Sequence, residues 1–234
     1  MKEQLERTAM LLGEAAVERL QRCHVAIVGL GGVGSYAAEA VARAGVGELT
    51  LVDCDTVSVT NLNRQLCALH STVGRPKTQV TAARLRDINP DAVLHPLELF
   101  YTPETRENLF SCRYDYIIDA IDTVSAKTDL IVSAIERGIP IISALGTGNK
   151  LHPELLRFAD IYETSVCPLA RAMRRELRKR GVAAHRVLYS TEEPRGATGR
   201  ENGRNYPGSA AWVPGCAGLM LAGDVITSLA ALPD

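Results

Sequence analysis

The sequence predicts an α/β fold: a doubly wound, mostly parallel sheet with helices on both faces, followed by a C-terminal α/β extension. Three observations predict it. Apolar runs alternate with helical segments over residues 25–144, a glycine-spaced turn joins the first run to a helix, and an acidic residue ends the second run. This alternation is typical of parallel strands with crossover helices, whose ligands bind at the carboxyl ends of the strands.

The composition indicates an ordinary globular chain, and we expect one domain over residues 1–234. A net charge of −1, with 46% hydrophobic and 23% charged residues, gives no global basic bias toward nucleic acid or membrane. The six cysteines are scattered without a C-x-x-C pair. We therefore expect no structural zinc site built from C-x-x-C pairs, and a reduced, cytoplasmic setting. The first residues lack the apolar core of a signal peptide.

The periodicity of apolar residues places the elements in order. The N-terminal segment, 1–22, is expected to form an amphipathic helix over 3–22, with Leu5 and Leu20 among its apolar residues. The core, 23–145, is expected to alternate strand and helix, with stops at Asn89-Pro90 and Gly138-Ile139-Pro140. Its expected elements are strands 25–29, 48–53, 93–98, 115–119 and 139–144 and helices 33–45, 75–88, 103–110 and 125–137.

The C-terminal extension, 146–234, follows a different pattern. We expect extended chain over 150–163, a helix over 166–180 and a strand over 186–191. Residues 193–208 have almost no apolar side chains, which predicts a mobile loop without a packed element. The apolar segment 210–232 contains Pro214 and Asp224. A carboxylate in lipid costs ~2.5–3.5 kcal/mol, so we expect a buried helix and no membrane span.

The glycines lie between the first strand and the first helix, at positions 29, 31, 32 and 34. Gly29-x-Gly31-x-x-Gly34 allows a tight turn, close approach of phosphate to the backbone beside Gly32, and an anion at the helix N-terminus. Asp53 ends the second strand, where dinucleotide-binding folds place the acid that holds ribose. A strand-end turn residue is the alternative for Asp53. Together these features predict a Rossmann-like nucleotide site.

The polar side chains that follow exceed what a dehydrogenase needs. Asn61, Arg64 and Gln65 precede Lys77, which lies near a helix start, where a cation gains nothing from the helix dipole and is expected to meet a bound anion. A solvated surface lysine is the alternative. Asp122 follows a core strand at the same edge, where a carboxylate can hold Mg²⁺, and a helix cap is the alternative.

Five motifs in order over residues 25–124 resemble the adenylation domain that ubiquitin-activating enzymes share with bacterial sulfur-carrier adenylyltransferases, the ThiF-like superfamily. They are GLGGVGS, LVDCDTV, NLNRQ, VGRPK and DAIDTV. The resemblance implies ATP and Mg²⁺ as cofactors. It implies that Asp53, of the pair Asp53 and Asp55, holds ribose, and that the ATP phosphates meet three residues: Asn61, Arg64 and Lys77. Asp122 would hold Mg²⁺, and Gln65 is a further candidate for cofactor binding.

The leader from Arg7 to Gly13 also resembles the N-terminal segment of that superfamily, whose arginine reaches the ATP of the partner subunit. This implies a homodimer in which Arg7 completes the partner's active site. Arg7 would join Arg64, Lys77 and the Mg²⁺ on Asp122 in offsetting charge during catalysis. An exposed helix arginine is the alternative.

Sulfur-carrier adenylyltransferases generally carry two C-x-x-C zinc pairs, which this chain lacks. The C-terminal third instead resembles the tRNA threonylcarbamoyladenosine dehydratases, through residues 146–150, 159–161, 168–170 and 213–219. That family adenylates the threonylcarbamoyl carboxylate on the adenosine beside the anticodon and then cyclises it with loss of water. Two alternatives stay open: adenylation of the C-terminus of a sulfur-carrier or ubiquitin-like protein, with a sulfur-transfer partner, and a nucleotide-gated binding module without turnover.

A tRNA substrate requires cations, and the expected helix 166–180 with its flank supplies seven against the single acid Glu176. They are Arg171, Arg174, Arg175, Arg178, Lys179, Arg180 and Arg186. A solvated helix face is the alternative. Cys167 begins the same helix, and the resemblance to ubiquitin-activating enzymes, which carry a thioester cysteine after the adenylation core, makes a catalytic thiol the alternative for it. We favour a structural role for Cys167, because intramolecular cyclisation needs no thiol.

Overall fold

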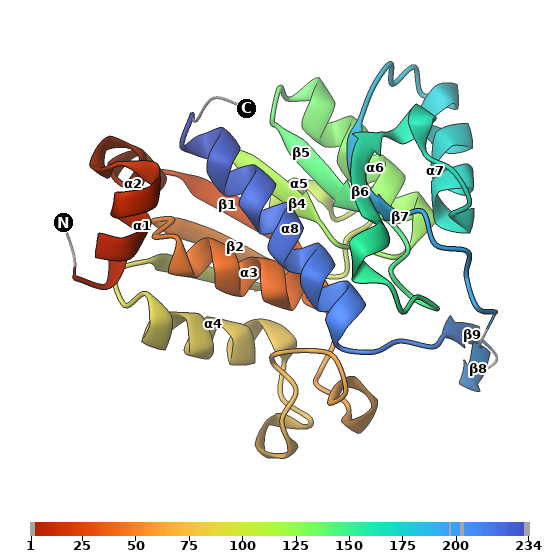
Figure 1. Cartoon of the computed structure of the whole chain (residues 1–234), viewed down its shortest axis with the longest axis horizontal. Helices are drawn as coiled ribbons and strands as arrows, with labels where there is room; N and C mark the ends of the chain where they lie inside the picture. Colours follow the sequence, from red (N-terminus) through yellow and green to blue (C-terminus); the bar gives the residue numbers. More distant parts are fainter. Residues whose placement is uncertain (1–2, 197, 202–203, 232–234) are drawn as a thin grey trace.

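A computed structural model describes residues 3–196, 198–201 and 204–231, with only the backbone of 200, 201, 204 and 205. Its seven-stranded sheet has the order β3-β2-β1-β4-β5-β7-β6 (Figure 1). All neighbouring strands pair in parallel except β6 and β7, so the predicted mostly parallel sheet is confirmed. The strands are β1 (His24–Val28), β2 (Glu48–Asp53), β3 (Val93–Glu98), β4 (Tyr116–Asp119), β5 (Ile141–Ala144), β6 (Leu156–Asp160) and β7 (Arg186–Ser190).

Helices cover both faces of the sheet because alternate side chains of its central strands enter two apolar cores. In β1, Ile27 joins one core, while Ala26 and Val28 join the other. The first core is covered by α3 (Gly34–Arg43), α4 (Lys77–Ile88) and α8 (Trp212–Leu229). The second is covered by α5 (Arg106–Leu109), α6 (Val124–Glu136) and α7 (Pro168–Lys179). These elements begin and end within three residues of the predicted ones.

The prediction of one helix over 3–22 was wrong. A 3₁₀ turn (Glu3–Leu5) leads into α1 (Glu6–Leu12), and α2 (Glu14–Leu20) follows. Gly13 separates the two helices with a φ of +87°, a left-handed conformation that interrupts helical hydrogen bonding. A Cβ added to Gly45 would lie 2.8 Å from Leu5, so this N-terminal unit packs against the turn before β2. It therefore lies at the amino ends of the strands.

Among the described helices, α8 alone is long and apolar enough to cross a bilayer. It passes over the sheet beside α3 (Figure 1), and a Cβ added to Gly218 would lie 2.2 Å from the carbonyl oxygen of Val33. Ala217, Leu221 and Val225 have no exposed surface and belong to the first core. These contacts match the predicted buried helix.

The prediction of a loop without a packed element over residues 193–208 was wrong, because strands form there. Within the described part of this segment, β8 (Thr198–Glu201) and β9 (Arg204–Pro207) form an antiparallel hairpin. Its backbone groups pair with one another, so the hairpin forms without an apolar core. Ala197, Asn202 and Gly203 lie outside the described residues. The expected extended chain over 150–163 contains β6 flanked by 3₁₀ turns at Pro153–Leu155 and Ile161–Glu163.

Candidate active site

The glycine turn lies where β1, β2 and β4 end together. Gly29 has a φ of +93°, and a Cβ there would lie 2.8 Å from the carbonyl oxygen of Ala120. A Cβ at Gly34 would lie 1.7 Å from the carbonyl oxygen of Gly29. Both positions are therefore glycine because the protein's own backbone needs the space. A Cβ added to Gly31 would lie 3.9 Å from its nearest neighbour, Gln65 Nε2, so this side of the backbone is open to a ligand.

The helix that follows this turn presents an open N-terminus. Val33 is the N-cap of α3, and its side chain makes no capping hydrogen bond. The first N–H bonded back into the turn is that of Ser35, which donates to the carbonyl oxygen of Gly31 at 3.1 Å. The preceding N–H groups are suited to the phosphate that the glycine spacing predicts.

Asp53 ties the end of β2 to the glycine turn. Its two carboxylate oxygens accept hydrogen bonds from the N–H of Leu30 at 2.7 Å and of Asp55 at 2.8 Å. The turn-residue alternative thus describes part of what Asp53 does. Each oxygen retains a second lone pair, so the predicted ribose contact is compatible with these bonds.

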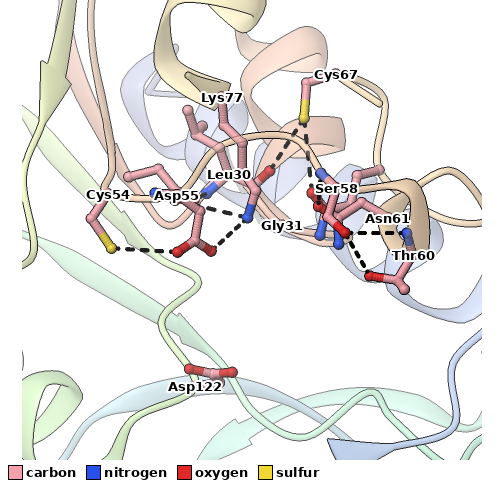
Figure 2. A network of polar contacts seen from close by, with 12 residues as sticks. Leu30, Gly31, Cys54, Asp55, Ser58, Thr60, Asn61, Cys67, Lys77 and Asp122 are labelled. Atoms are coloured by element: carbon pink, nitrogen blue, oxygen red, sulfur yellow. Dashed lines mark hydrogen bonds and ion pairs between the residues drawn. The ribbon is translucent and has the colours of Figure 1, made fainter. Parts of the chain in front are cut away.

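Lys77 is not the solvated surface lysine that the sequence left open, because only 4% of it is exposed. Its Nζ lies 2.7 Å from Asp55 Oδ2 and 3.9 Å from Asp53 Oδ1 (Figure 2). The Asp55 side chain is 63% exposed. Lys77 therefore offers a preoriented cation at the sheet edge, paired with a carboxylate that is free to move away.

The segment that carries Asn61, Arg64 and Gln65 lies against the glycine turn. Arg64 Cγ would be 3.4 Å from a Cβ on Gly32, and Gln65 Nε2 is the nearest group to Gly31. Arg64 Nη1 donates to the carbonyl oxygen of Thr60 and to Asn63 Oδ1, both at 2.9 Å. Asn61 Oδ1 accepts the N–H of Ser58 at 3.0 Å, which fixes the 3₁₀ turn Val59–Asn61 (Figure 2).

Asp122 is an exposed carboxylate on the loop after β4, apart from the network of Asp55 and Lys77 (Figure 2). The helix-cap alternative was wrong, because Thr123 is the N-cap of α6 and no side chain caps that helix. An exposed carboxylate at the ligand edge fits Mg²⁺, which binds through one or two carboxylates and several waters.

Sequence reasoning missed a buried polar network directly beneath this loop. Lys127 Nζ lies 2.7 Å from Asp119 Oδ2, and neither side chain has exposed surface. Ser143 Oγ donates to the same oxygen at 2.6 Å, and His185 Nε2 lies 2.8 Å from Ser143 Oγ. Asp119 Oδ1 accepts the N–H of Ile121 at 3.0 Å. The network thereby fixes the start of the loop that carries Asp122.

Stability is expected to fall on acidification through His185. Burial, and then the nearby Lys127 cation, lower the pKa of His185 from 6.5 to about 4. The unfolded chain therefore binds the proton first, and the free energy of unfolding should drop by about 3 kcal/mol as the pH falls from 7 to 4. Urea unfolding of wild type and His185→Gln across this range measures the difference. A parallel pH dependence in both proteins would contradict the assignment.

The basic helix α7 buries Ala170, Met173 and Leu177 and turns its cations outward. A surface hollow of about 680 Å³ is lined by Pro168, Arg171, Ala172, Arg174, Arg175 and Arg178. The prediction that Arg186 belongs with the cations of α7 was wrong. Arg186 lies on β7, pairs with Asp224 of α8 at 2.5 Å and stacks on Phe158, on the other face of the sheet. Side chains alternate along a strand, so closeness in sequence does not place it with the helix.

Two other candidates lie outside the glycine cluster. Cys167 is 3% exposed and caps α7, its Sγ accepting the N–H of Ala170 at 3.5 Å, which fits the structural role we favour. Arg7 is exposed on α1, at the amino ends of the strands. The structure therefore does not bring Arg7 together with the glycine turn of its own chain.

Comparisons with known proteins agree with the predicted family and fold. The model of the ThiF family matches residues 5–233. The tRNA threonylcarbamoyladenosine dehydratase of Bacillus subtilis is 43% identical over 98% of this chain and 95% of its own length. The crystal structure of Escherichia coli tRNA N6-threonylcarbamoyladenosine dehydratase with AMP superposes with a TM-score of 0.88 at 35% identity, covering 96% of this chain and 93% of that one. Its complex with ATP gives 0.87 at 34% identity, covering 99% and 97%.

Proposed function

The chain belongs to the ThiF family, and from that premise we propose that it catalyses the ATP-dependent dehydration of threonylcarbamoyladenosine in tRNA. The observation that carries this proposal is the similarity to a dehydratase over nearly the whole of both chains, including the C-terminal extension. All 234 residues serve as one adenylation domain. Its described cysteines are free thiols, which fits a cytoplasmic enzyme.

The proposed reaction has two steps, adenylation of a carboxylate and cyclisation. An oxygen of the threonylcarbamoyl carboxylate attacks the α-phosphorus of ATP, and pyrophosphate leaves. A nucleophilic N–H or O–H group of the same modified nucleoside then attacks the activated carbonyl carbon, and its proton is released to solvent. AMP leaves with one carboxylate oxygen, so that, relative to its carboxylic acid form, the nucleoside has lost one water. The tethered nucleophile has a high effective concentration and needs no enzyme thiol.

The chain's residues position the reactants and offset charge. The N–H groups of the glycine turn, with Asn61, Arg64 and Lys77, meet the phosphates, and Asp53 and Gln65 orient the nucleotide. When Lys77 contacts a phosphate, the exposed Asp55 carboxylate is released to solvent. Asp122 would hold Mg²⁺, which would supply further charge neutralisation beside the phosphates.

The direct experiment incubates the full chain with ATP, Mg²⁺ and tRNA that carries threonylcarbamoyladenosine. Nucleoside mass spectrometry should show the loss of one water, together with AMP and pyrophosphate. Activity that requires the C-terminus of a carrier protein would instead support the sulfur-carrier alternative. That alternative is disfavoured because no possible metal-ligand group among the described residues contains more than one cysteine. Nucleotide binding without adenylation would indicate a binding module.

The basic helix α7 is expected to bind tRNA phosphates. Replacing Arg171, Arg175 and Arg178 with alanine should lower the slope of log affinity against log salt by about 2–3, because each phosphate contact contributes ~0.7–0.9. Arg174 is left in place because its Nη1 donates to the carbonyl oxygen of Thr164 at 2.8 Å. Filter binding at several salt concentrations measures the slope. Arg186→Ala, on the other face, is the matched control, and equal slopes in all proteins would remove α7 from the interface.

A homodimer in which Arg7 serves the partner's ATP site explains why Arg7 lies at the opposite end of the sheet from its own site. Arg7→Ala and Asp122→Ala should each be nearly inactive. Mixing the two after unfolding and refolding should restore about a quarter of wild-type activity, because half the dimers are mixed and one of their two sites is intact. Failure to recover activity, with mixed dimers shown by differential tagging, would place Arg7 outside the partner's site.

A further inference from the structure

A second cluster of metal-ligand side chains lies at the amino end of the sheet. It contains His24 at the start of β1, Glu48 at the start of β2, and His95 in β3, and one ligand atom from each lies within 4.8 Å of the others. The five residue steps of β2 from Glu48 to Asp53 span roughly 16 Å. The cluster is therefore separate from the nucleotide site.

The strand register preorganises this cluster. His24 pairs with Glu48 across β1 and β2, and Thr50, two residues further along β2, pairs with His95. Paired residues of adjacent strands share a face, as do residues two apart in one strand. All four side chains therefore project from the same face, held by backbone hydrogen bonds of three neighbouring strands and not by a flexible loop.

The Glu48 carboxylate joins the two imidazoles of the cluster and is hydrogen-bonded to one of them, His95. Glu48 Oε1 lies 2.7 Å from His95 Nε2 and 3.5 Å from His24 Nδ1. The other ring nitrogen of His24, Nε2, lies 2.8 Å from Thr50 Oγ1, and Tyr114 packs edge-on against the His24 ring at 4.7 Å. Metal-binding histidines use such an outer partner to fix the tautomer and the ring orientation. With Nε2–H donating to Thr50, the lone pair of Nδ1 faces the cluster.

We propose that His24, Glu48 and His95 bind one divalent transition-metal ion of the Zn²⁺ class. Two imidazole nitrogens and one carboxylate oxygen, with water in the remaining position, are an established donor set for zinc. Mg²⁺ and Ca²⁺ prefer oxygen ligands alone and are not expected there. The side chains of His95 and Glu48 are 45% and 40% exposed, so ion and water reach the site from solvent. The bound ion would join β1, β2 and β3 at their amino ends.

The test uses the tag-free full chain after removal of metal with EDTA and of EDTA by dialysis. Titration with Zn²⁺ by calorimetry should show one site per chain, and Co²⁺ should give the visible absorption of a four- or five-coordinate ion. Glu48→Gln and His95→Gln should each weaken Zn²⁺ binding at least about tenfold. Both residues are partly exposed, so the variants should keep the wild-type circular dichroism spectrum.

Two control variants separate this site from others on the chain. His152→Gln removes an exposed histidine that lies 2.9 Å from Glu154 and should leave Zn²⁺ binding unchanged, because within the described part of the chain this pair belongs to no group of three ligands. Cys54→Ser alters the cluster of Asp53, Cys54 and Asp55 at the nucleotide site and should also leave it unchanged. Absence of stoichiometric binding in wild type, equal affinity in the Glu48 and His95 variants, or loss of binding in Cys54→Ser would each overturn the proposal.

Discussion

Asp122→Ala and Arg64→Ala are each expected to lower the rate of adenylation by a factor of about 10²–10³, equivalent to ~3–4 kcal/mol of transition-state stabilisation. Negative charge develops on the α-phosphate and on the departing pyrophosphate. Asp122 would hold the Mg²⁺ and Arg64 would supply a cation beside the glycine turn, so each variant removes one fixed source of positive charge. Pyrophosphate release from ATP with modified tRNA measures the step.

The geometry predicts that these losses are functional and not due to unfolding. Asp122 is exposed and caps no helix, and the two hydrogen bonds of Arg64 Nη1 are made to neighbouring surface groups. Both variants should therefore keep the wild-type unfolding midpoint in urea. Asp87→Ala and Arg43→Ala, which remove exposed charges of the same kinds from α4 and α3, are the controls. Wild-type turnover in Asp122→Ala or Arg64→Ala would contradict the site assignment.

The sequence predicted those parts of the site that lie at the carboxyl ends of parallel strands. The glycine turn, Asp53 and Asp122 follow β1, β2 and β4, and the topology alone brings them to one edge. The pairing of Lys77 with Asp55 depends on the path of the chain between β2 and α4, for which the apolar pattern gives no signal. The position of Lys77 at a helix start predicted a contact with an anion, but the sequence did not predict that the side chain is buried.

The position of Arg186 and the burial of Lys127 were not predicted, because partners distant in sequence decide both. Arg186 lies away from the cations of α7 because its carboxylate partner, Asp224, is in α8 on the opposite face of the sheet. Lys127 gave no signal at all, because its partner Asp119 and the neighbouring Ser143 and His185 come from separate strands and loops.

Lys127→Met is expected to lower the free energy of unfolding by about 3–5 kcal/mol, the largest stability loss that we expect from a single substitution. The substitution keeps the length of the side chain but removes the cation, and it leaves the Asp119 carboxyl group without its counter-charge and without exposed surface. Ser143 Oγ and the N–H of Ile121 continue to donate to that carboxylate, but hydrogen bonds do not neutralise its charge. Urea unfolding followed by circular dichroism measures the loss.

The double variant Asp119→Asn/Lys127→Met distinguishes an unpaired charge from a packing defect. The asparagine amide is neutral and its oxygen still accepts one of these hydrogen bonds, so most of the lost stability should return. A double variant as unstable as Lys127→Met would show that Lys127 acts through packing.

The double variant also tests whether the buried pair affects the active site. Asp119 holds the N–H of Ile121 at the start of the Asp122 loop. We expect the charged pair to orient that loop as well as to stabilise the fold. The double variant should then fold normally but adenylate more slowly than wild type.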